Sequence, residues 1–242
     1  EGIGYGMLLA VAWDERSLFD GLFAYSKRMR GAGSTLMNWL RYDCEANRRE
    51  TYSLYPDGAA ADADLDVAMA LIMAACRWGD AAYRSEAIPI VNAIRQPMFM
   101  ESEGRRVLQP GDSLWFDELG AGCVNYSYFA PAYYRAFAEL VPADADFWNG
   151  AAADTYPLLA NASHGTTGLV RNWGSAGGGD ATADCHAAYN RAASYGDDAA
   201  RTPWRIATDY LWYGTPAAKS WNDKVTGWVA TQPISATVQW YN

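Results

Sequence analysis

The sequence predicts an all-α fold of helical hairpins that pack in layers. Apolar residues recur at helical spacing in pairs of neighbouring segments, and long loops separate each pair from the next. No stretch shows the alternation of strands and helices that is typical of an α/β protein. We therefore expect residues 1–242 to form one domain, with the long loops gathered at one end of the helices to form a site.

The predicted hairpins each consist of two apolar, periodic segments, and they cover residues 3–13 with 18–29, 62–78 with 81–94, 128–140 with 143–159, and 198–213 with 216–228. These segments make about eight helices. The helix at 81–94 is expected to break or kink at Pro89, because proline lacks an amide hydrogen. Residues 96–127 are predicted to be loop with short extended pieces, and residues 165–196 a glycine-rich loop.

Composition and charge limit the classes of partner. The chain has 19 Lys and Arg against 28 Asp and Glu, a formal net charge of -9, and its basic residues do not cluster. A nucleic acid is therefore not an expected partner. The 11 Trp and 16 Tyr exceed what packing alone requires, and flat apolar faces with polar edges suit sugar rings. A neutral, polyhydroxylated substrate fits this balance.

The cysteines leave two interpretations open. They are far apart and lack the spacing of zinc sites, at Cys44, Cys76, Cys123 and Cys185. Two disulfides or four buried thiols would both fit, and an isolated cysteine is ordinarily a small core residue. No apolar run reaches the roughly 18 residues that span a bilayer, so a membrane partner is not expected. The chain starts with Glu1 rather than Met, which predicts a mature or truncated product.

Three aspartates, Asp62, Asp64 and Asp66, stand at the predicted start of a helix. Taken alone, Asp62 would be the N-cap of this helix and the other two would complement the helix dipole. A calcium-binding loop is excluded, because Val67 stands where the loop needs Gly and no Glu follows at the last liganding position. The sequence predicts neither a metal site nor a cofactor.

Residues 60–74, followed by Trp78, closely resemble the signature of glycoside hydrolase family 8. The match departs at Ala61, where the family usually has Ser or Thr, and at Val67, where it usually has Ile or Met. Neither change removes a reacting group. Further segments resemble conserved stretches of the family in the same order, namely Glu1–Met7, Ser127–Tyr134 and Asp198–Arg205. The resemblance covers essentially the whole chain.

The family resemblance implies an (α/α)6 barrel of six inner and six outer helices. With about eight predicted helices, we expect an incomplete barrel that is truncated at both ends and lacks a helix before Glu1 and roughly three after Asn242. Truncation of this kind would leave apolar faces of inner helices uncovered. The resemblance also implies a secreted or periplasmic enzyme, which we expect to be a monomer.

The resemblance further implies inverting hydrolysis of β-1,4-linked polysaccharides by two carboxyl groups. Glu1 would donate a proton to the glycosidic oxygen, and Asp198, roughly 6.5 to 9.5 Å away, would activate a water on the opposite face. Asp62 would raise the pKa of the acid with its negative charge and would bond the distorted sugar. Asp197 is the alternative base. The Asp-Ala-x-Arg spacing selects Asp198, and Asp197 would then shape the field around it.

Further residues are candidates for substrate binding. Arg201, one helical turn beyond the predicted base, would orient the Tyr128 hydroxyl or a neighbouring carboxylate. The alternatives are a loop ion pair for Arg201 and core packing for Tyr128. Trp39, Trp115 and Trp173 fall in predicted loops and are expected to stack on sugar rings, although a single Trp is more often part of a core.

The favoured function is that of an endoglucanase acting on cellulose or mixed-linkage glucan. An endo-β-1,4-xylanase is the closest alternative, and a chitosanase is the next. An alternative of another class is a non-catalytic carbohydrate-binding protein that keeps the aromatic platforms. The presence of Glu1, Asp62 and Asp198 in matched segments argues against it, because a binding protein has no need of separated carboxylates.

Overall fold

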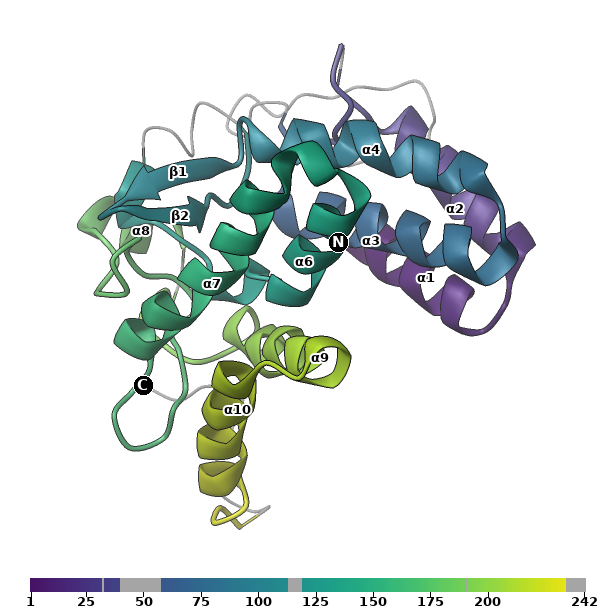
Figure 1. The fold of residues 1–242 in the computed structure, drawn as a ribbon. Coiled ribbons are helices and arrows are strands. Elements are labelled where there is room, and N and C mark those ends of the chain that lie inside the picture. The colour runs from purple at the N-terminus through teal and green to yellow at the C-terminus, as the bar shows by residue number, and fades with distance from the viewer. Residues whose placement is uncertain (32, 40–57, 113–118, 190, 234–242) are drawn as a thin grey trace. The chain divides into compact units, whose positions relative to one another are not determined.

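A computed structural model describes residues 1–31, 33–39, 58–112, 119–189 and 191–233 (Figure 1). Helices dominate these residues, in agreement with the predicted fold class. The chain divides into two compact units, one made of Glu1–Phe99 with Pro110–Glu118 and the other of Met100–Gln109 with Leu119–Asn242. None of the described helices is both long enough and apolar enough to cross a membrane.

The first unit consists of two helical hairpins. Its helices are α1 (Gly2–Ala12), α2 (Arg16–Arg28), α3 (Ala61–Trp78) and α4 (Ala81–Arg95). Helix α1 packs against α2 and α3, and α3 also packs against α4 (Figure 1). The residues of α3 from Ala61 to Leu71 are all buried, so the core of this unit forms around that helix.

A glycine lets α1 and α3 approach each other closely. A Cβ atom on Gly4 would lie 2.6 Å from the Cβ atom of Asp66 and 3.1 Å from the carbonyl oxygen of Ala63. The shorter of these distances is a clash in a close-packed interior, so a larger side chain would push the two helices apart. Gly4 therefore brings the start of α1 against the start of α3, the two segments that hold the predicted carboxylates of this unit.

Helix α4 continues through Pro89 as one helix, Ala81–Arg95, so the proline does not break it. Ala87 and Ile90, on either side of the proline, are buried. Packing of this face offsets the backbone hydrogen bond that the proline cannot make, because most of the stability of a helix in a protein comes from tertiary packing.

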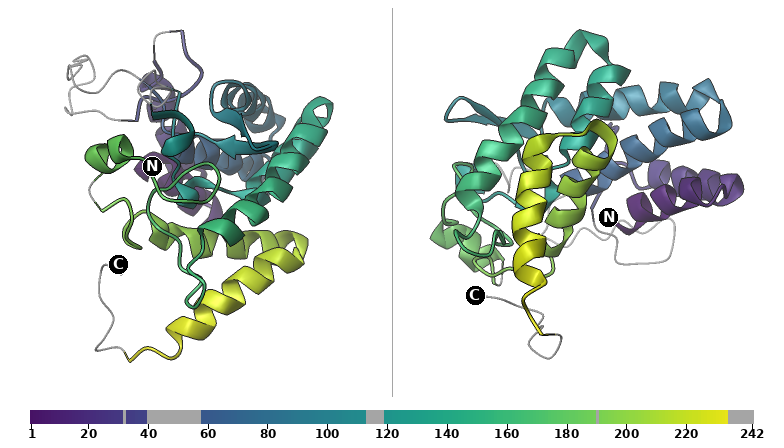
Figure 2. Two further views of the ribbon diagram at one scale, coloured as in Figure 1. Left: turned by 90° about the vertical axis from the view of Figure 1, so that its left-hand side faces the viewer. Right: turned by 60° about the horizontal axis from the view of Figure 1, so that its bottom comes forward.

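The second unit contains a two-stranded hairpin and two further helix pairs. The strands β1 (Phe99–Ser102) and β2 (Arg105–Leu108) agree with the predicted short extended pieces. Its helices are α6 (Pro131–Leu140), α7 (Ala145–Ala162), α8 (Ala183–Ala188), α9 (Thr202–Tyr213) and α10 (Pro216–Val229). Helix α6 packs against α7 and α9, and α9 packs against α10 (Figure 2). The short helix α8 lies in the predicted glycine-rich loop and was not expected.

The buried carboxylate of Asp209 joins three helices of the second unit through an ion pair and a hydrogen bond. Asp209 on α9 is fully buried, and its carboxylate accepts hydrogen bonds from Arg135 Nε on α6, at 2.9 Å, and from the Tyr156 hydroxyl on α7. Removing one partner from such a pair typically costs about 3–5 kcal/mol, because a charge is left buried and uncompensated. The network therefore holds α9, which directly follows the predicted base, in a defined place against α6 and α7.

A disulfide crosslinks the second unit, between Cys123 and Cys185, which are 62 residues apart. The expectation of buried thiols is wrong for this pair and also for Cys76, whose thiol is free but exposed. Cys44 lies outside the described residues. The disulfide belongs to a small core that also contains Trp173, so it ties α8 to the surroundings of a predicted site residue.

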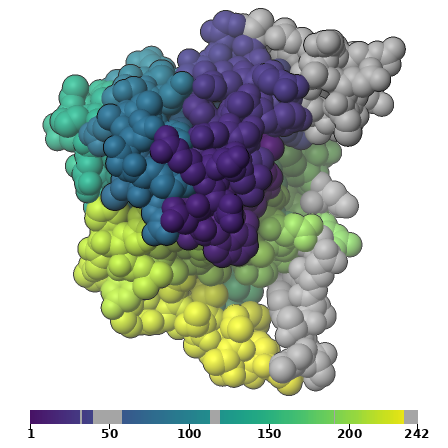
Figure 3. Space-filling model, turned by 90° about the vertical axis from the view of Figure 1, so that its right-hand side faces the viewer, coloured from purple at the N-terminus to yellow at the C-terminus, as the bar shows by residue number. Residues whose placement is uncertain are grey.

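Large apolar side chains stay exposed on several of the described helices. Trp13 after α1 and Leu18 on α2 are 71% and 55% exposed, and Leu211 on α9 is 76% exposed. The space-filling view shows α1 and α2, in purple, at the surface (Figure 3). These side chains are therefore available for contacts with other apolar groups.

Candidate active site

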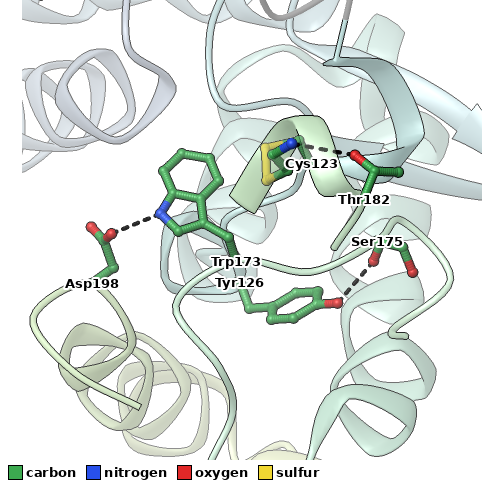
Figure 4. The surroundings of a disulfide bond; sticks show 7 residues. Cys123, Tyr126, Trp173, Ser175, Thr182 and Asp198 are labelled. Atoms are coloured by element: carbon green, nitrogen blue, oxygen red, sulfur yellow. Dashed lines mark hydrogen bonds between the residues drawn. A yellow bond between two sulfur atoms is a disulfide. The ribbon is translucent and has the colours of Figure 1, made fainter. Parts of the chain in front are cut away.

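The carboxylate of Asp198 is anchored through both of its oxygens in the second unit. The indole Nε1–H of Trp173 donates to Oδ2 at 2.9 Å (Figure 4), and Arg201 donates to Oδ1 and forms an ion pair with it. The Asp198 side chain is nevertheless 32% exposed. Each carboxylate oxygen has a second lone pair, so a water molecule can reach Asp198 and transfer a proton to it.

Arg201 is itself held by buried polar groups. Its Nε donates to Ser127 Oγ at 3.1 Å, and that hydroxyl donates to Asn125 Oδ1 at 2.7 Å. The Arg201 guanidinium carbon also lies 5.1 Å from the centre of the Tyr128 ring. Of the two roles expected of Arg201, the structure has the contact with a neighbouring carboxylate, and it adds a cation–π contact with the tyrosine ring.

Asn172 fixes the backbone on both sides of Asp198. Its side chain is buried, and its Oδ1 accepts hydrogen bonds from the amides of Gly196, at 3.1 Å, and Ala199, at 2.9 Å. Sequence reasoning missed Asn172, Asn125 and Ser127. The partners of Asn172 lie more than twenty residues further along the chain, and an amide that binds at such a distance leaves no local signal in the sequence.

Trp173 does not offer a free ring face to a sugar, so its expected role as a stacking platform is corrected. The side chain is only 4% exposed, and Tyr189 stacks on one face at 3.7 Å and 10°. The Tyr128 ring approaches it at a steep angle, with a centroid distance of 6.3 Å. Trp173 instead reaches the site with its polar edge, through the hydrogen bond to Asp198 (Figure 4).

Asp197 and Tyr128 flank this arrangement. Asp197 is exposed, whereas Asp198 is half-buried and receives the hydrogen bonds from Arg201 and Trp173. The geometry therefore favours Asp198 over its neighbour as a positioned base. Tyr128 is half-buried and contacts both Arg201 and Trp173 with its ring, so it forms a wall of the same cluster.

Glu1 lies at the N-cap position of α1 in the first unit and is half-buried. Tyr5, one helical turn further on, donates its hydroxyl to Glu1 Oε1 at 2.5 Å. This hydrogen bond restricts the rotation of the carboxyl group. Tyr5 is therefore a functional candidate that sequence reasoning did not single out, although the spacing of four residues on a helix was visible.

Asp62 is not the N-cap of α3, so that interpretation is wrong. The helix begins at Ala61 with Ala60 at the N-cap position. Asp62 is only 2% exposed, and its Oδ1 accepts a hydrogen bond from the Ala63 amide at 2.9 Å. The residue is a buried carboxyl on the first turn of the central helix.

Asp64, two residues later on α3, is also 2% exposed. Its Oδ1 accepts a hydrogen bond from the Met37 amide at 3.1 Å. The pKa of Asp64 is raised to about 8, mainly by burial and in smaller part by the charges of Asp112 and Asp62, while the Met37 hydrogen bond opposes these effects. Sequence reasoning assigned Asp64 only to the helix dipole, which requires a negative charge.

Trp39 keeps the exposure that a stacking platform needs. Its side chain is 43% exposed, and its amide donates to the Gly58 carbonyl at 3.0 Å. Trp115, the remaining predicted platform, lies outside the described residues. Of the predicted platforms that the structure describes, Trp39 is therefore the one with an exposed side chain.

A cavity of about 380 Å³ lies elsewhere in the second unit, bordered by His164, Arg171 and Trp228. It is lined by none of the predicted site residues. In the part of the chain that the structure describes, no three His, Cys, Asp or Glu side chains gather in a way that could hold a metal ion.

The two units thus hold carboxyl groups in different settings. In the second unit, Asp198 is hydrogen-bonded, paired with a guanidinium and accessible to water, which suits a general base. In the first unit, Glu1 is half-buried against a phenol and Asp62 is buried.

Comparison with known families and relatives matches this chain to one family. The sequence model of Glycosyl hydrolases family 8 matches residues 1–234. Endoglucanase 2 of Ruminiclostridium josui is 38% identical over 229 residues, and Endoglucanase A of Acetivibrio thermocellus is 36% identical over 246 residues. These alignments cover 93% and 100% of this chain but 45% and 48% of the relatives. The chain spans about half the length of the curated relatives it matches.

Solved structures share the fold. Rex8A from Paenibacillus barcinonensis, complexed with xylose, has a TM-score of 0.79 at 26% identity and covers 97% of this chain and 62% of its own. Endoglucanase Cel10 from Klebsiella pneumoniae has a TM-score of 0.78 at 26% identity and covers 100% of this chain and 73% of its own. Family 8 enzymes are (α/α)6 barrels, and the helices of this chain match part of one, which confirms the predicted fold class.

Proposed function

Because this chain belongs to Glycosyl hydrolases family 8, we propose that it hydrolyses β-1,4-linked polysaccharides with inversion at the anomeric carbon. The observation that carries the proposal is the setting of Asp198. Its carboxylate is oriented by Arg201 and Trp173 yet stays 32% exposed. A structural ion pair would not need access to water, whereas a general base does.

In the proposed reaction, Asp198 removes a proton from a water molecule as that water attacks the anomeric carbon. Glu1 donates its proton to the leaving glycosidic oxygen, and the bond between that oxygen and the anomeric carbon breaks. The Tyr5 hydroxyl, 2.5 Å from Glu1 Oε1, orients this acid. Asp62 binds the distorted sugar ring and disfavours early loss of the proton from Glu1.

The proposed substrate is a β-1,4-glucan, either cellulose or mixed-linkage glucan, cleaved internally. Two relatives with 38% and 36% identity are named endoglucanases, and exposed Trp39 suits stacking on a pyranose ring. Xylan is the second candidate, because a relative with 29% identity is named a reducing-end xylose-releasing exo-oligoxylanase. Chitosan is the third.

A non-catalytic carbohydrate-binding protein is the alternative from another class. It would need Trp39 but not an anchored, water-accessible carboxylate such as Asp198. The relatives' names and this carboxylate favour the enzyme. We further propose that the enzyme is a monomer and is secreted or periplasmic, as the family resemblance implies.

An activity panel on carboxymethylcellulose, lichenan, xylan and chitosan tests the proposed substrate. We expect the highest rate on the first two, measured as released reducing ends. Turnover no faster than that of an Asp198→Asn variant on all four substrates would contradict the enzymatic function and leave the binding protein.

The stereochemistry of the first product tests the mechanism. Proton NMR recorded early in the hydrolysis of a β-linked glucan should show the α-anomer at the new reducing end, because a single displacement inverts the anomeric carbon. A β-anomer would mean a double displacement and would contradict the roles given to Glu1 and Asp198.

A further inference from the structure

We propose that Asp64 is a positioning residue that, as a neutral carboxylic acid, holds the Trp39 segment, residues 36–39, in place for substrate binding. The proposal rests on the proposed function in one respect, because Trp39 matters only if it stacks on a sugar. Asp64 has no part in the reaction described above.

A buried hydrogen bond links Asp64 to this segment. The Asp64 Oδ1 atom accepts from the Met37 amide at 3.1 Å, across 27 residues of chain. The Met37 side chain packs in a small core with Met29 and Ala63. Trp39 follows two residues later, and its side chain is 43% exposed. The Asp64 carboxyl group on α3 therefore holds Met37 in place, two residues before the exposed ring of Trp39.

Backbone hydrogen bonds support the rest of the segment. The Asn38 amide donates to the Met29 carbonyl at 2.9 Å, and the Trp39 amide donates to the Gly58 carbonyl at 3.0 Å. Both would remain if Asp64 were replaced. Loss of Asp64 is therefore expected to loosen the segment around Met37 rather than to unfold it.

The surroundings of Asp64 favour the neutral acid. Its Oδ2 atom is buried and has no hydrogen-bond partner among the described residues. An ionised carboxylate would leave negative charge on this oxygen without a partner, which is far more costly than a neutral hydroxyl in the same place. The charged side chains that act on it are the carboxylates of Asp112 and Asp62, which oppose ionisation. Burial adds to the opposition and raises the pKa of Asp64 to about 8.

A neutral Asp64 can be imitated by asparagine. The amide oxygen of Asp64→Asn can still accept the Met37 hydrogen bond, and its NH₂ group takes the place of the hydroxyl. Asp64→Leu has a similar size but cannot accept a hydrogen bond. These two variants separate the anchoring contact from the volume of the side chain and from its charge.

Hydrogen exchange tests the anchor without any substrate. At pH 7 the Met37 amide should exchange about tenfold faster in Asp64→Leu than in the natural protein, as expected for the loss of one hydrogen bond. In Asp64→Asn it should keep its protection. Equal protection of this amide in all three proteins would overturn the proposal.

Steady-state kinetics on cellohexaose test the consequence for binding. Asp64→Leu should raise KM about fivefold and leave kcat within about twofold, because the reacting groups are unchanged. Asp64→Asn should restore KM. Trp39→Ala should raise KM by a similar factor, and the double variant Trp39→Ala/Asp64→Leu should be no worse than Trp39→Ala, because both changes act through the same ring.

Asp80→Leu is the matched control in the same unit. Asp80 also accepts a hydrogen bond from a backbone amide, that of Ala82 at 3.0 Å, but it caps α4. We expect no change in KM. A rise equal to that of Asp64→Leu would show that any lost carboxylate–amide bond weakens binding, and it would overturn the special role of Asp64.

The remaining outcomes also decide the matter. A loss of kcat in Asp64→Asn would mean that Asp64 acts as a charged reacting group. Additive effects of Asp64→Leu and Trp39→Ala on KM would mean that Asp64 does not act through the Trp39 ring. Either result overturns the proposal. If neither Asp64→Leu nor Asp64→Ala folds, Asp64 is a stability residue and the proposal fails. If the natural protein hydrolyses no glycan, the proposed function fails, while hydrogen exchange still decides whether Asp64 anchors the segment.

Discussion

Asp64 in the first unit and Asp198 in the second both stand at the start of helical segments, yet the structure holds them in opposite ways. Asp64 is 2% exposed, and it accepts a hydrogen bond from the Met37 backbone amide. Asp198 is 32% exposed, and its two oxygens face a guanidinium and an indole N–H. The same side chain thus serves as a buried acceptor or as a water-accessible base, and the packing around it decides which.

The largest expected effect comes from removing the base. Asp198→Asn should lower kcat by about 1,000-fold or more, because asparagine cannot take a proton from water. The affinity for cellohexaose, measured by calorimetric titration, should change little. Asp197→Asn is the control and should stay within about threefold of the natural rate. If the two variants exchange these results, Asp197 is the base.

The next effect concerns the covalent crosslink near Asp198. The double variant Cys123→Ser/Cys185→Ser should lose about 4 kcal/mol of unfolding free energy on the chain-entropy account, since the bond closes a loop of 62 residues. Chemical denaturation measures this loss. Cys76→Ser, which removes an exposed free thiol, should leave the midpoint unchanged. A loss well below 1 kcal/mol in the double variant would mean that the second unit holds its site without the disulfide.

Trp173→Phe tests whether the indole hydrogen bond orients the Asp198 carboxylate. Phenylalanine keeps the aromatic contact with Tyr189 but cannot donate a hydrogen bond to the carboxylate. We expect kcat to fall about tenfold with KM within about twofold, because one hydrogen bond to a charged group is lost. Trp212→Phe, on the exposed side of α9, is the control. A rise in KM with kcat unchanged would restore Trp173 as a sugar platform.

The pH dependence of stability tests the other half of the comparison. An unfolded aspartate loses its proton near pH 4, whereas burial raises the pKa of Asp64 in the folded protein to about 8. The stability that this group contributes is therefore present below pH 4 and is lost as pH rises to about 8. Asp64→Asn does not titrate, so its free energy of unfolding relative to that of the natural protein should rise by about 1.4 kcal/mol per pH unit in this window.

Asp80→Asn provides the opposite case for the same denaturation series. Hydrogen bonds from Ala82 and Arg16 lower the pKa of Asp80 in the folded protein. The stability that it contributes is therefore present above the unfolded pKa and is lost only in acid. The difference in unfolding free energy between Asp80→Asn and the natural protein should stay constant from pH 5 to pH 8. A flat difference for Asp64→Asn as well would mean that Asp64 is not held neutral.

Much of the fold could be predicted from the sequence, because helices carry their periodicity locally. The hairpins of both units follow from apolar spacing and from residues such as Gly79 and Gly214, which end helices in the left-handed conformation. The misses have tertiary causes. Packing overrides Pro89 in α4, and six residues in a glycine-rich stretch form α8, where Cys185 joins Cys123.

The candidate site could be predicted only in part. The motif segments identify Asp198, Arg201 and Tyr128, which the structure brings together in one cluster. Their spacing does not show that Asn172 holds the backbone around the base or that Ser127 holds the arginine. These contacts join residues that are far apart in the chain, so they exist only after folding.

The sequence by itself determined most of the helices, which family the chain resembles and which carboxyl groups are available for chemistry. Only the tertiary structure decided what each side chain does. It turned the Trp173 ring inward so that its polar edge meets Asp198, and it buried Asp64 against the Met37 amide. The physical reason is that proton affinity, exposure and hydrogen-bond partners depend on neighbours in space, and those neighbours come from distant parts of the chain.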